Sequence, residues 1–364
     1  MTRMVSSLTV LVYEYFCGGG SAPGPWPSRT VFEALGMLWA VLTDFRGLSA
    51  VRTITAFNPR LDNQIPGLHR AALPADEVED ALPGSHEKVF LSLLRRCEAA
   101  LIIAPETNGI LSKLTAFAES AGIAVLGSSS SAVELAGNKA VLNRIFCKSK
   151  IPVPETRVTD FYAAAQAARA IGWPVVIKPL DGVGSEGIFR VNNRMELPSI
   201  LANIRQTTTH EKFIVQAFSP GIPVSVSLLI AEENCLPLSL NRQWVDTRFS
   251  FHYRGSTVPF PHPMSHSIIN LARKAADLVP GLRGYVGVDL MLENTRCQVI
   301  EINPRLTTSY IGLRQVARAN LAKAICHAAL EGTLPEPIPL VGQVVIKQDD
   351  PGTWNLKGDA CSKL

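Results

Sequence analysis

The sequence lacks the cysteine and histidine patterns that would indicate a zinc site or a disulfide framework. Its seven cysteines are scattered without a CxxC pair, and its seven histidines do not recur at a zinc-ligand spacing. An odd number of unclustered cysteines is typical of free thiols in a reducing compartment. We therefore expect a cytoplasmic protein.

Long apolar runs and long runs of one charge are also missing. The apolar run Leu8–Tyr13 is too short to span a membrane, and Glu14 with three glycines follows where a secretory leader would be cleaved. The formal net charge is only +4, from 35 basic and 31 acidic residues, and no basic stretch contains interleaved aromatic residues. We expect neither a membrane nor a nucleic acid as a partner.

The order of the apolar runs predicts an α/β lobe followed by α+β subdomains. With 364 residues, more than one hydrophobic core is expected. Short β-rich runs alternate with helical spacing over residues 1–128, which predicts a mostly parallel sheet. We expect a subdomain with a glycine-rich hairpin over 129–218, a second with antiparallel strands over 219–345, and a polar tail over 346–364. The oligomeric state stays open, and a homo-oligomer is compatible with the sequence.

Three side chains with oxygen atoms are predicted to meet on one face of a hairpin. The β-rich runs Gly284–Leu292 and Cys297–Asn303 are joined by four polar residues. Glu301 and Asn303 are two positions apart, so both point to one face, and Asp289 on the partner strand can lie beside them. Carboxylates among apolar neighbours are costly without a cation, and hard oxygen ligands suit Mg²⁺, so we predict a magnesium site. A solvated sheet face with incidental acids is the alternative.

A lysine and a glycine-rich turn are predicted to bind phosphate groups. Lys178 ends a buried β-rich run, and the segment Asp181–Gly187 follows at once. Backbone N–H groups of such a turn can approach phosphate oxygens closely, and the lysine adds a point charge. No Gly-Lys-Ser/Thr closes the turn, so it is not a Walker A motif, and an ordinary hairpin turn is the alternative. The candidates in the turn are Gly182, Gly184, Ser185 and Gly187.

A strand and a lysine on either side of this turn are candidates because of their neighbours. The strand ending at Gln216, Ala217 and Phe218 can present backbone N–H and C=O groups to an adenine, whose faces need apolar walls. Lys139 begins a helical stretch, and such a lysine is usually just solvated. It becomes a phosphate-binding candidate only together with Lys178.

Two arginines near the predicted acidic hairpin are candidates for a catalytic role. Arg305 lies two residues after Asn303, and Arg242 lies in a neighbouring predicted strand. A guanidinium fork matches a phosphoryl or acyl-phosphate group whose charge grows in the transition state. A surface salt bridge is the alternative for each.

Taken in order, these pieces resemble the ATP-grasp superfamily over about residues 105–330. The matching segments are Asn138-Lys139, Val176-Ile-Lys-Pro179 with its glycine loop, Val215–Gly221, Asp289 and Glu301-Ile-Asn-Pro-Arg305. The resemblance implies the ATP-grasp fold, with residues 1–128 as the lobe that precedes such domains. It also implies ATP and Mg²⁺ as cofactors, with Mn²⁺ as a substitute for Mg²⁺.

The resemblance assigns a role to each matching residue. Lys139 and Lys178 would contact ATP phosphates, and the glycine loop would close over them. The strand Gln216–Phe218 would hold the adenine, and Asp289, Glu301 and Asn303 would hold Mg²⁺. An acid that many members use for the ribose is missing near Ala217 and Pro223, so the ribose contacts stay open.

A narrower resemblance rests on the segments Glu14–Gly20 and Glu301–Tyr310. Both are similar to the tyramine–glutamate ligase group, which serves methanofuran synthesis in methanogens and is related to methylofuran synthesis in methylotrophs. This implies that the γ-carboxylate of L-glutamate is phosphorylated and then attacked by the amine of tyramine or tyrosine. Glu14 ends the first predicted strand, where open α/β sheets bind ligands, so it could engage a substrate ammonium. A carboxylate that caps the glycine loop is the alternative.

Three other functions remain open from the sequence alone. Another ATP-grasp ligase or carboxylase would share every ATP contact and differ in the first lobe and in the aromatic, proline-rich segment 244–266. A regulatory module could bind ATP without consuming it. An NAD(P)-binding protein is disfavoured, because Gly18-Gly-Gly20 does not have the GxGxxG spacing.

Overall fold

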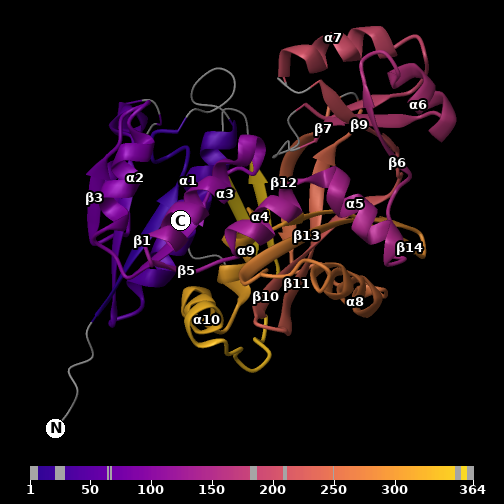
Figure 1. The fold of residues 1–364 in the computed structure, drawn as a ribbon. Coiled ribbons are helices and arrows are strands. Elements are labelled where there is room, and N and C mark those ends of the chain that lie inside the picture. The colour runs from indigo at the N-terminus through magenta and orange to yellow at the C-terminus, as the bar shows by residue number, and fades with distance from the viewer. Residues whose placement is uncertain are drawn as a thin grey trace.

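The chain forms three sheets, one in each of three regions (Figure 1). The computed structural model describes residues 7–20, 29–63, 65, 68–180, 187–207, 211–248, 250–348 and 354–358. Within this part of the chain, none of the helices has the length and apolarity required to cross a membrane.

The N-terminal region is a five-stranded parallel sheet in the order β3-β2-β1-β4-β5. The central strand β1 (Leu8–Glu14) is buried from Val10 onward, as expected for a strand that helices cover on both faces. This confirms the parallel α/β lobe that the alternating pattern predicts. Its elements are α1 (Arg29–Arg46), β2 (Val51–Phe57), β3 (Glu77–Asp80), α2 (His86–Leu94), β4 (Ala99–Ile103), α3 (Ile110–Ser120) and β5 (Ala124–Val125).

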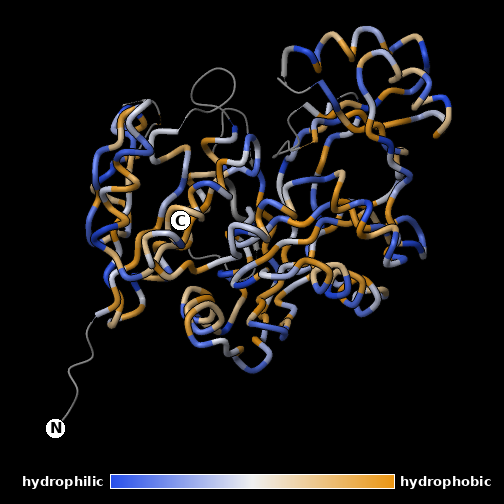
Figure 2. Tube along the Cα trace, viewed as in Figure 1, coloured by the Kyte–Doolittle hydropathy of each residue, from blue (hydrophilic) through white to orange (hydrophobic). Residues whose placement is uncertain are grey.

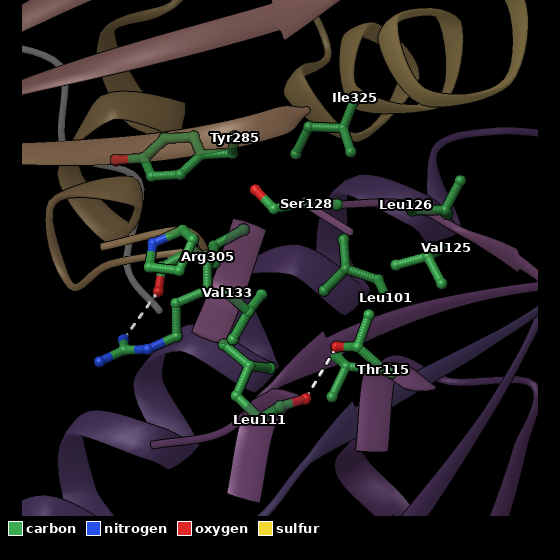
Figure 3. A pocket seen from close by; sticks show the side chains of 14 residues that line it. Leu101, Leu111, Thr115, Val125, Leu126, Ser128, Val133, Tyr285, Arg305 and Ile325 are labelled. Carbon is green, nitrogen blue, oxygen red and sulfur yellow. Dashed lines mark hydrogen bonds between the residues drawn. The ribbon is translucent and has the colours of Figure 1, made fainter. Parts of the chain in front are cut away.

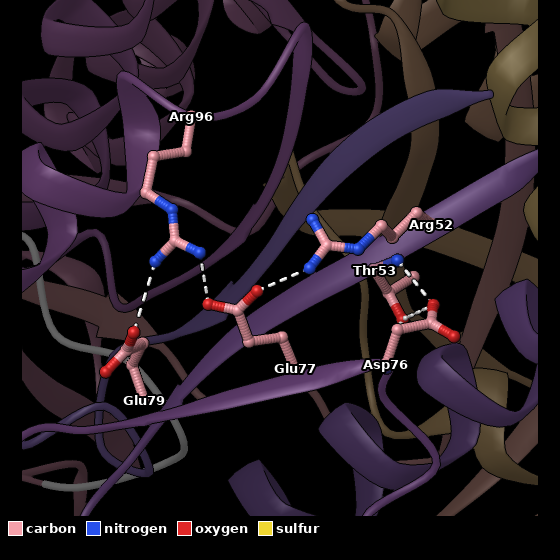
Figure 4. Close-up of polar contacts among 6 residues, drawn as sticks. All are labelled: Arg52, Thr53, Asp76, Glu77, Glu79 and Arg96. Atoms are coloured by element: carbon pink, nitrogen blue, oxygen red, sulfur yellow. Dashed lines mark hydrogen bonds and ion pairs between the residues drawn. The ribbon is translucent and has the colours of Figure 1, made fainter. Parts of the chain in front are cut away.

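Ion pairs accompany the backbone pairing and the packed Val78 side chain in attaching the edge strand β3, which the sequence pattern did not predict. Glu77 accepts from Arg52 at 2.5 Å and also from Arg96, which contacts Glu79 at 3.1 Å (Figure 4). The hydrogen bonds from Arg96, followed by those from Arg52, lower the pKa of Glu77. The acidic segment Glu-Val-Glu-Asp does not have the alternating apolar residues that predict a strand. Its arginine partners are distant in the sequence and can be identified only in the folded chain.

The helical stretch after the lobe is divided into two helices. Asn138 separates α4 (Ser130–Gly137) from α5 (Lys139–Lys148), with φ −85° and ψ 87°. Its side-chain oxygen accepts the Val141 N–H at 3.1 Å, which caps α5. The break places Lys139 at the first position of a new helix. Apolar side chains of α4 and α5 share a core with the large sheet rather than with the small one.

The small sheet is antiparallel, in the order β6-β9-β7-β8, and lies at the upper right in Figure 1. Its core includes Ile177, Ile200 and Phe213, all fully buried under two helices. Its elements are β6 (Thr156–Asp160), α6 (Ala164–Ile171), β7 (Val175–Pro179), β8 (Phe189–Val191), α7 (Leu197–Thr207) and β9 (Lys212–Ala217).

The large sheet has seven antiparallel strands in the order β14-β13-β10-β11-β12-β15-β16. Alternate residues of a strand face different cores: Val224 and Val226 pack with α8, whereas Leu229 and Ala231 belong to the core shared with the N-terminal lobe. Figure 2 shows many apolar residues along the trace in the middle of the molecule, where this sheet lies. The elements are β10 (Ile222–Ala231), β11 (Asn234–Asp246), β12 (His252–Val258), α8 (Ser265–Ala276), β13 (Gly284–Glu293), β14 (Arg296–Asn303), α9 (Ser309–Val316) and α10 (Leu321–Cys326), followed by a π-helical turn (His327–Glu331).

The expected polar tail over residues 346–364 is wrong for its first part. β15 (Val344–Gln348) pairs with β12, and β16 (Trp354–Gly358) pairs with β15 at the edge of the large sheet. Val344 and Ile346 are fully buried under α9. These two apolar side chains form too short a sequence pattern to distinguish a strand from a polar tail.

A buried carboxylate in α1 connects the N-terminal lobe to the helices that follow the large sheet. Asp44 is 8% exposed and accepts from the Tyr310 hydroxyl at 2.6 Å and from Arg314 Nε at 2.9 Å. Its backbone carbonyl accepts from the Asn320 side chain at 2.7 Å. Asp44 is therefore well supplied with donors despite its burial.

We predict that Tyr310→Phe destabilises the protein by about 1–3 kcal/mol, because Asp44 loses a buried hydroxyl donor while the ring packing is kept. Urea unfolding followed by fluorescence measures the change. The matched control is Tyr162→Phe, the same chemical change at a side chain that is 95% exposed, which should leave the midpoint unchanged. Equal midpoints for Tyr310→Phe and the wild type would contradict the anchoring role of this contact.

Candidate active site

Two carboxylates and an amide meet on β13 and β14, as the hairpin pattern predicts. The strand register pairs Asp289 with Glu301 and Gly287 with Asn303. The Asn303 amide donates to Asp289 Oδ2 at 3.0 Å, and the Gln243 amide on β11 donates to Asp289 Oδ1 at 2.9 Å. All four polar side chains therefore lie on one face of the large sheet.

The electrostatics of this pair fit a divalent cation. Burial, followed by repulsion from Glu301, raises the pKa of Asp289 to about 7. Burial would also raise the pKa of Glu301, but Lys139 and Lys178 outweigh it and hold that pKa below its usual value. One carboxylate thus tends to keep a proton beside its ionised neighbour, and a hard cation can replace that proton. No three His, Cys, Asp or Glu side chains of the described residues form a metal-binding group, so such an ion would rely on these two acids and an amide oxygen.

Two lysines from different elements face the acids. Lys139 Nζ, on α5, lies 3.1 Å from Glu301 Oε2, and its side chain is 9% exposed. Lys178, on β7, is 4% exposed, and burial lowers its pKa to about 8 although Glu301 opposes the change. A buried ammonium is stabilised by anionic partners, so this pair is suited to a polyphosphate.

A cleft between the small and the large sheet joins these groups. Its empty space is about 770 Å³, part of it open to solvent. Lys178 and Gln216 line one wall, and Asp289, Glu301 and Gln243 line the other. Apolar side chains complete the cleft, among them Val176, Ile188, Phe218, Val245, Phe251, Met291 and Ile300. An apolar cleft with charged groups at one end is suited to a nucleotide.

The backbone N–H groups of Ala217 and Phe218 are not available to bind an adenine, which corrects one part of the role expected for this strand. The N–H groups of Ala217 and Phe218 already donate to the carbonyls of Glu155 at 2.8 Å and Pro174 at 3.1 Å. Neither N–H can read an adenine, because neighbouring loops of the small sheet use both. Gln216, Ala217 and Phe218 instead form part of the wall of the cleft. The guanidinium carbon of Arg190 lies 4.1 Å from the centroid of the Phe218 ring.

Most of the predicted glycine turn lies outside the described residues. This applies to Gly182, Gly184 and Ser185. Gly187 is described and has a φ of +69°, which favours glycine, and it leads into β8. The phosphate-binding role of this turn stays a prediction.

The structure does not bring Arg242 to the site, which corrects the expectation that it frames the acids. Arg242 pairs with Val224 and Thr257, so it faces the side of the large sheet that α8 covers, whereas its neighbour Gln243 faces the cleft. Its guanidinium stacks over the ring of Trp244 at 4.1 Å. Successive side chains of this thirteen-residue strand point to opposite faces of the sheet. Which of them point to the cleft could not be determined without the pairing of the strand with its neighbours.

Arg305 follows the last residue of β14 by two positions, and a residue that the sequence analysis missed binds its side chain. Its Nε and Nη2 donate to the two oxygens of Glu106 at 2.9 and 3.1 Å, with side chains only 13% and 6% exposed. Glu106 lies in the loop after β4 of the N-terminal lobe. The bidentate pair, with Glu301 and Glu14 further away, raises the pKa of Arg305 above its usual value although burial opposes this.

Glu14 caps a turn rather than facing the cleft. It is 1% exposed, and its Oε2 accepts the Cys17 N–H at 2.7 Å. The glycines that follow are required for packing: a Cβ at Gly18 would lie 2.7 Å from the Tyr13 ring, and one at Gly20 would lie 2.5 Å from the Tyr15 ring. The capping alternative thus describes its contacts, and contact with a substrate ammonium stays a prediction.

A second hollow lies between the lobes and is lined mostly by apolar side chains (Figure 3). Leu101, Leu111, Val133 and Ile325 surround it, and the Arg305 side chain leads out of it, with its Nη1 donating to the Leu306 carbonyl at 3.1 Å. The hollow is a gap in the interface; it shares no lining residue with the cleft, and Arg305 is the charged residue in its lining.

Two site residues, Gln243 and Glu106, were missed for different reasons. Gln243 is next to Arg242, the residue that we selected from the sequence. Gln243 contacts Asp289 because its side chain, and not that of Arg242, points to the cleft face of the strand. Glu106 lies about 200 positions before its partner. The one available signal was an acid directly after a buried strand at the carboxyl edge of a parallel sheet, where ligands commonly bind.

Comparison with known families identifies two domains. Residues 136–309 match the family model described as an ATP-grasp domain, and residues 51–133 match the model described as a pre ATP-grasp 3 domain. The tyramine–L-glutamate ligase of Methanocaldococcus jannaschii is 35% identical over 230 residues, which are 63% of this chain and 63% of that protein. The matched region thus spans less than two thirds of that relative.

Solved structures show the same fold. An ATP-grasp superfamily protein from Archaeoglobus fulgidus superposes with a TM-score of 0.68 and 23% identity, over 98% of this chain and 100% of that one. Biotin carboxylase from Campylobacter jejuni superposes with a TM-score of 0.75 and 14% identity, over 95% and 76% of the two chains. At these identities the likeness concerns the fold alone, and it confirms the predicted fold class.

We predict that Glu14→Gln changes how stability depends on pH. Burial raises the pKa of Glu14 from 4.5 to about 7, although the Cys17 N–H and Arg305 oppose this. The folded state therefore binds the proton more tightly than the unfolded state, and the wild type loses stability as pH rises from 4.5 to 7. The loss is on the order of 3 kcal/mol at most and should be absent in the variant. Urea midpoints at pH 5 and pH 8 measure it, and identical pH slopes in both proteins would disprove the shift.

Proposed function

We propose that this chain, which carries an ATP-grasp domain and has the ATP-grasp fold, is an ATP-dependent carboxylate–amine ligase. Its substrates are the γ-carboxylate of L-glutamate and the amine of tyramine or tyrosine, in methanofuran or methylofuran biosynthesis. The observation that carries the proposal is that Lys178, Asp289 and Glu301 line one largely apolar cleft, with Lys139 paired to Glu301 at 3.1 Å. The name of the relative at 35% identity supports the two substrates.

Asp289, Glu301 and the amide oxygen of Asn303 would hold the divalent cation, with Mg²⁺ as the expected ion and Mn²⁺ as a substitute. When bound, the cation would neutralise phosphate charge. Lys178 lines the cleft, and Lys139 adds a second positive charge next to Glu301. The apolar walls next to Phe218 and Met291 suit the base.

The proposed reaction has two displacements. A carboxylate oxygen of glutamate attacks the γ-phosphorus, and the bond to the ADP oxygen breaks, which gives an acyl phosphate. The amine nitrogen then attacks the carbonyl carbon, inorganic phosphate leaves, and the nitrogen loses a proton as the amide forms. Lys139, Lys178 and Arg305 supply fixed positive charge to oxygens that become more negative. Positioning and exclusion of water supply most of the rate enhancement.

The direct test is ADP release with defined substrates. Purified protein with ATP and Mg²⁺ should release ADP when L-glutamate and tyramine are both present, and mass spectrometry should detect a product joined through an amide. Tyrosine replaces tyramine in a parallel reaction. Omission of either substrate is the control. Tight ATP binding without ADP release for any tested pair would favour a regulatory module instead.

We also predict that Asp289→Asn reduces ADP formation more than a hundredfold, because several kcal/mol of charge stabilisation depends on the cation. The protein without ligands should be at least as stable as the wild type, since the substitution removes a buried charge beside Glu301. Activity and thermal unfolding are measured together, and Asp277→Asn, at an exposed helix end, is the matched control. An active variant, or one whose affinity for Mn²⁺ with ATP is unchanged, would remove Asp289 from the metal site.

A further inference from the structure

Arg305 has a defined set of hydrogen bonds that leaves one pair of donors unused. A guanidinium carries five N–H groups. Nε and one N–H of Nη2 bind the two oxygens of Glu106, and one N–H of Nη1 binds the Leu306 carbonyl. One N–H remains on each of Nη1 and Nη2, and neither has a partner among the described residues. Both N–H groups are therefore available to a ligand, and the plane of the guanidinium fixes their directions.

The position of Glu106 makes it a rigid holder for this guanidinium. Its backbone carbonyl accepts the Gly109 N–H at 3.0 Å in a short turn after β4. Its side chain packs against the end of α4, where a Cβ on Gly137 would lie 3.3 Å from the Glu106 Cβ. Gly137 is two residues before Lys139, so Glu106 lies between the lysine-bearing helix and Arg305.

Arg305 lies close to the end of the strand that carries the candidate metal ligands. β14 ends at Asn303, so Arg305 follows Asn303 by two positions and Glu301 by four. A lone arginine in such a place would be drawn towards Glu301 and away from an incoming phosphoryl group. The bidentate pair with Glu106 counteracts this, since both oxygens of one carboxylate fix the plane of the guanidinium.

We infer that Glu106 of the N-terminal lobe is the positioning residue for Arg305, holding its guanidinium in place so that the two free N–H groups can bind oxygens of the phosphoryl group being transferred. The inference rests on the proposed ligase function and concerns the same site. It assigns to the N-terminal lobe a part in phosphoryl transfer that its distance along the chain conceals. Glu106 acts through Arg305 and does not itself touch the substrates.

Glu106→Gln tests this with little change in volume. An amide presents only one acceptor to the two donors, so the guanidinium loses its fixed plane. We expect kcat for ADP formation to fall roughly a hundredfold, as for a misplaced catalytic group, with the KM for ATP within about twofold of the wild-type value. The matched control is Glu87→Gln, which removes an exposed ion pair with Lys113 in the same lobe and should change neither parameter. A kcat for Glu106→Gln within about twofold of wild type would overturn the inference.

Chemical rescue separates positioning from a merely structural role. Arg305→Ala should lose activity and recover part of it on addition of a low, non-denaturing concentration of guanidinium chloride, because Glu106 can anchor the free ion. Arg305→Ala combined with Glu106→Gln should show no recovery. Equal recovery in both proteins would contradict the anchoring role of Glu106.

A measurement without substrates keeps the inference testable if Arg305→Ala does not fold. In the nitrogen NMR spectrum of the ligand-free protein, the Arg305 Nε–H should exchange slowly with water, and in Glu106→Gln it should exchange rapidly. Unchanged exchange would overturn the inference. A wild type that releases no ADP with any substrate pair defeats the proposed function instead, while the exchange result still reports on Glu106.

Discussion

The arrangement of the cleft depends on one electrostatic constraint, the placement of two carboxylates side by side on neighbouring strands. Asp289 and Glu301 are opposite each other in the register of β13 and β14, where water screens them poorly. Such a pair is costly unless cations surround it. Lys139 and Lys178 supply this charge from two elements that are distant in the sequence. The break at Asn138 and the direction of β7 can both be understood as ways to deliver an ammonium group to the same place.

The same logic explains how the N-terminal lobe is attached. Two of its carboxylates, Asp44 and Glu106, each bind a guanidinium from the part of the chain that follows β14. A buried ion pair contributes modest net stability, but loss of one partner leaves an uncompensated charge. Both contacts therefore favour one orientation of the lobe, and one of them ends at Arg305. The lobe does more than cover an apolar face of the large sheet, because Glu106 holds a side chain that follows the strand of the candidate metal ligands.

Prediction from the sequence was accurate where a local pattern carries the information. The acidic hairpin could be predicted because two apolar strands and a polar turn lie within about twenty residues. The edge strands β3 and β16 were missed because charges or a few contacts hold them, without apolar alternation. Arg242 was misplaced because a shift of one position reverses the face of a strand, and β11 is too long and mixed to reveal its parity.

The sequence by itself determined the parallel α/β lobe, the hairpin face shared by Asp289, Glu301 and Asn303, and the strand that carries Lys178. Each of these follows from periodicity or spacing in the local sequence, which physical chemistry translates directly into strands, helices and turns. Only the tertiary structure decided that Glu106 holds Arg305, that Gln243 rather than Arg242 faces the acids, and that Glu14 caps its own turn. These are contacts between side chains brought together from distant positions or chosen by strand parity, and neither property is recorded in the local order of residues.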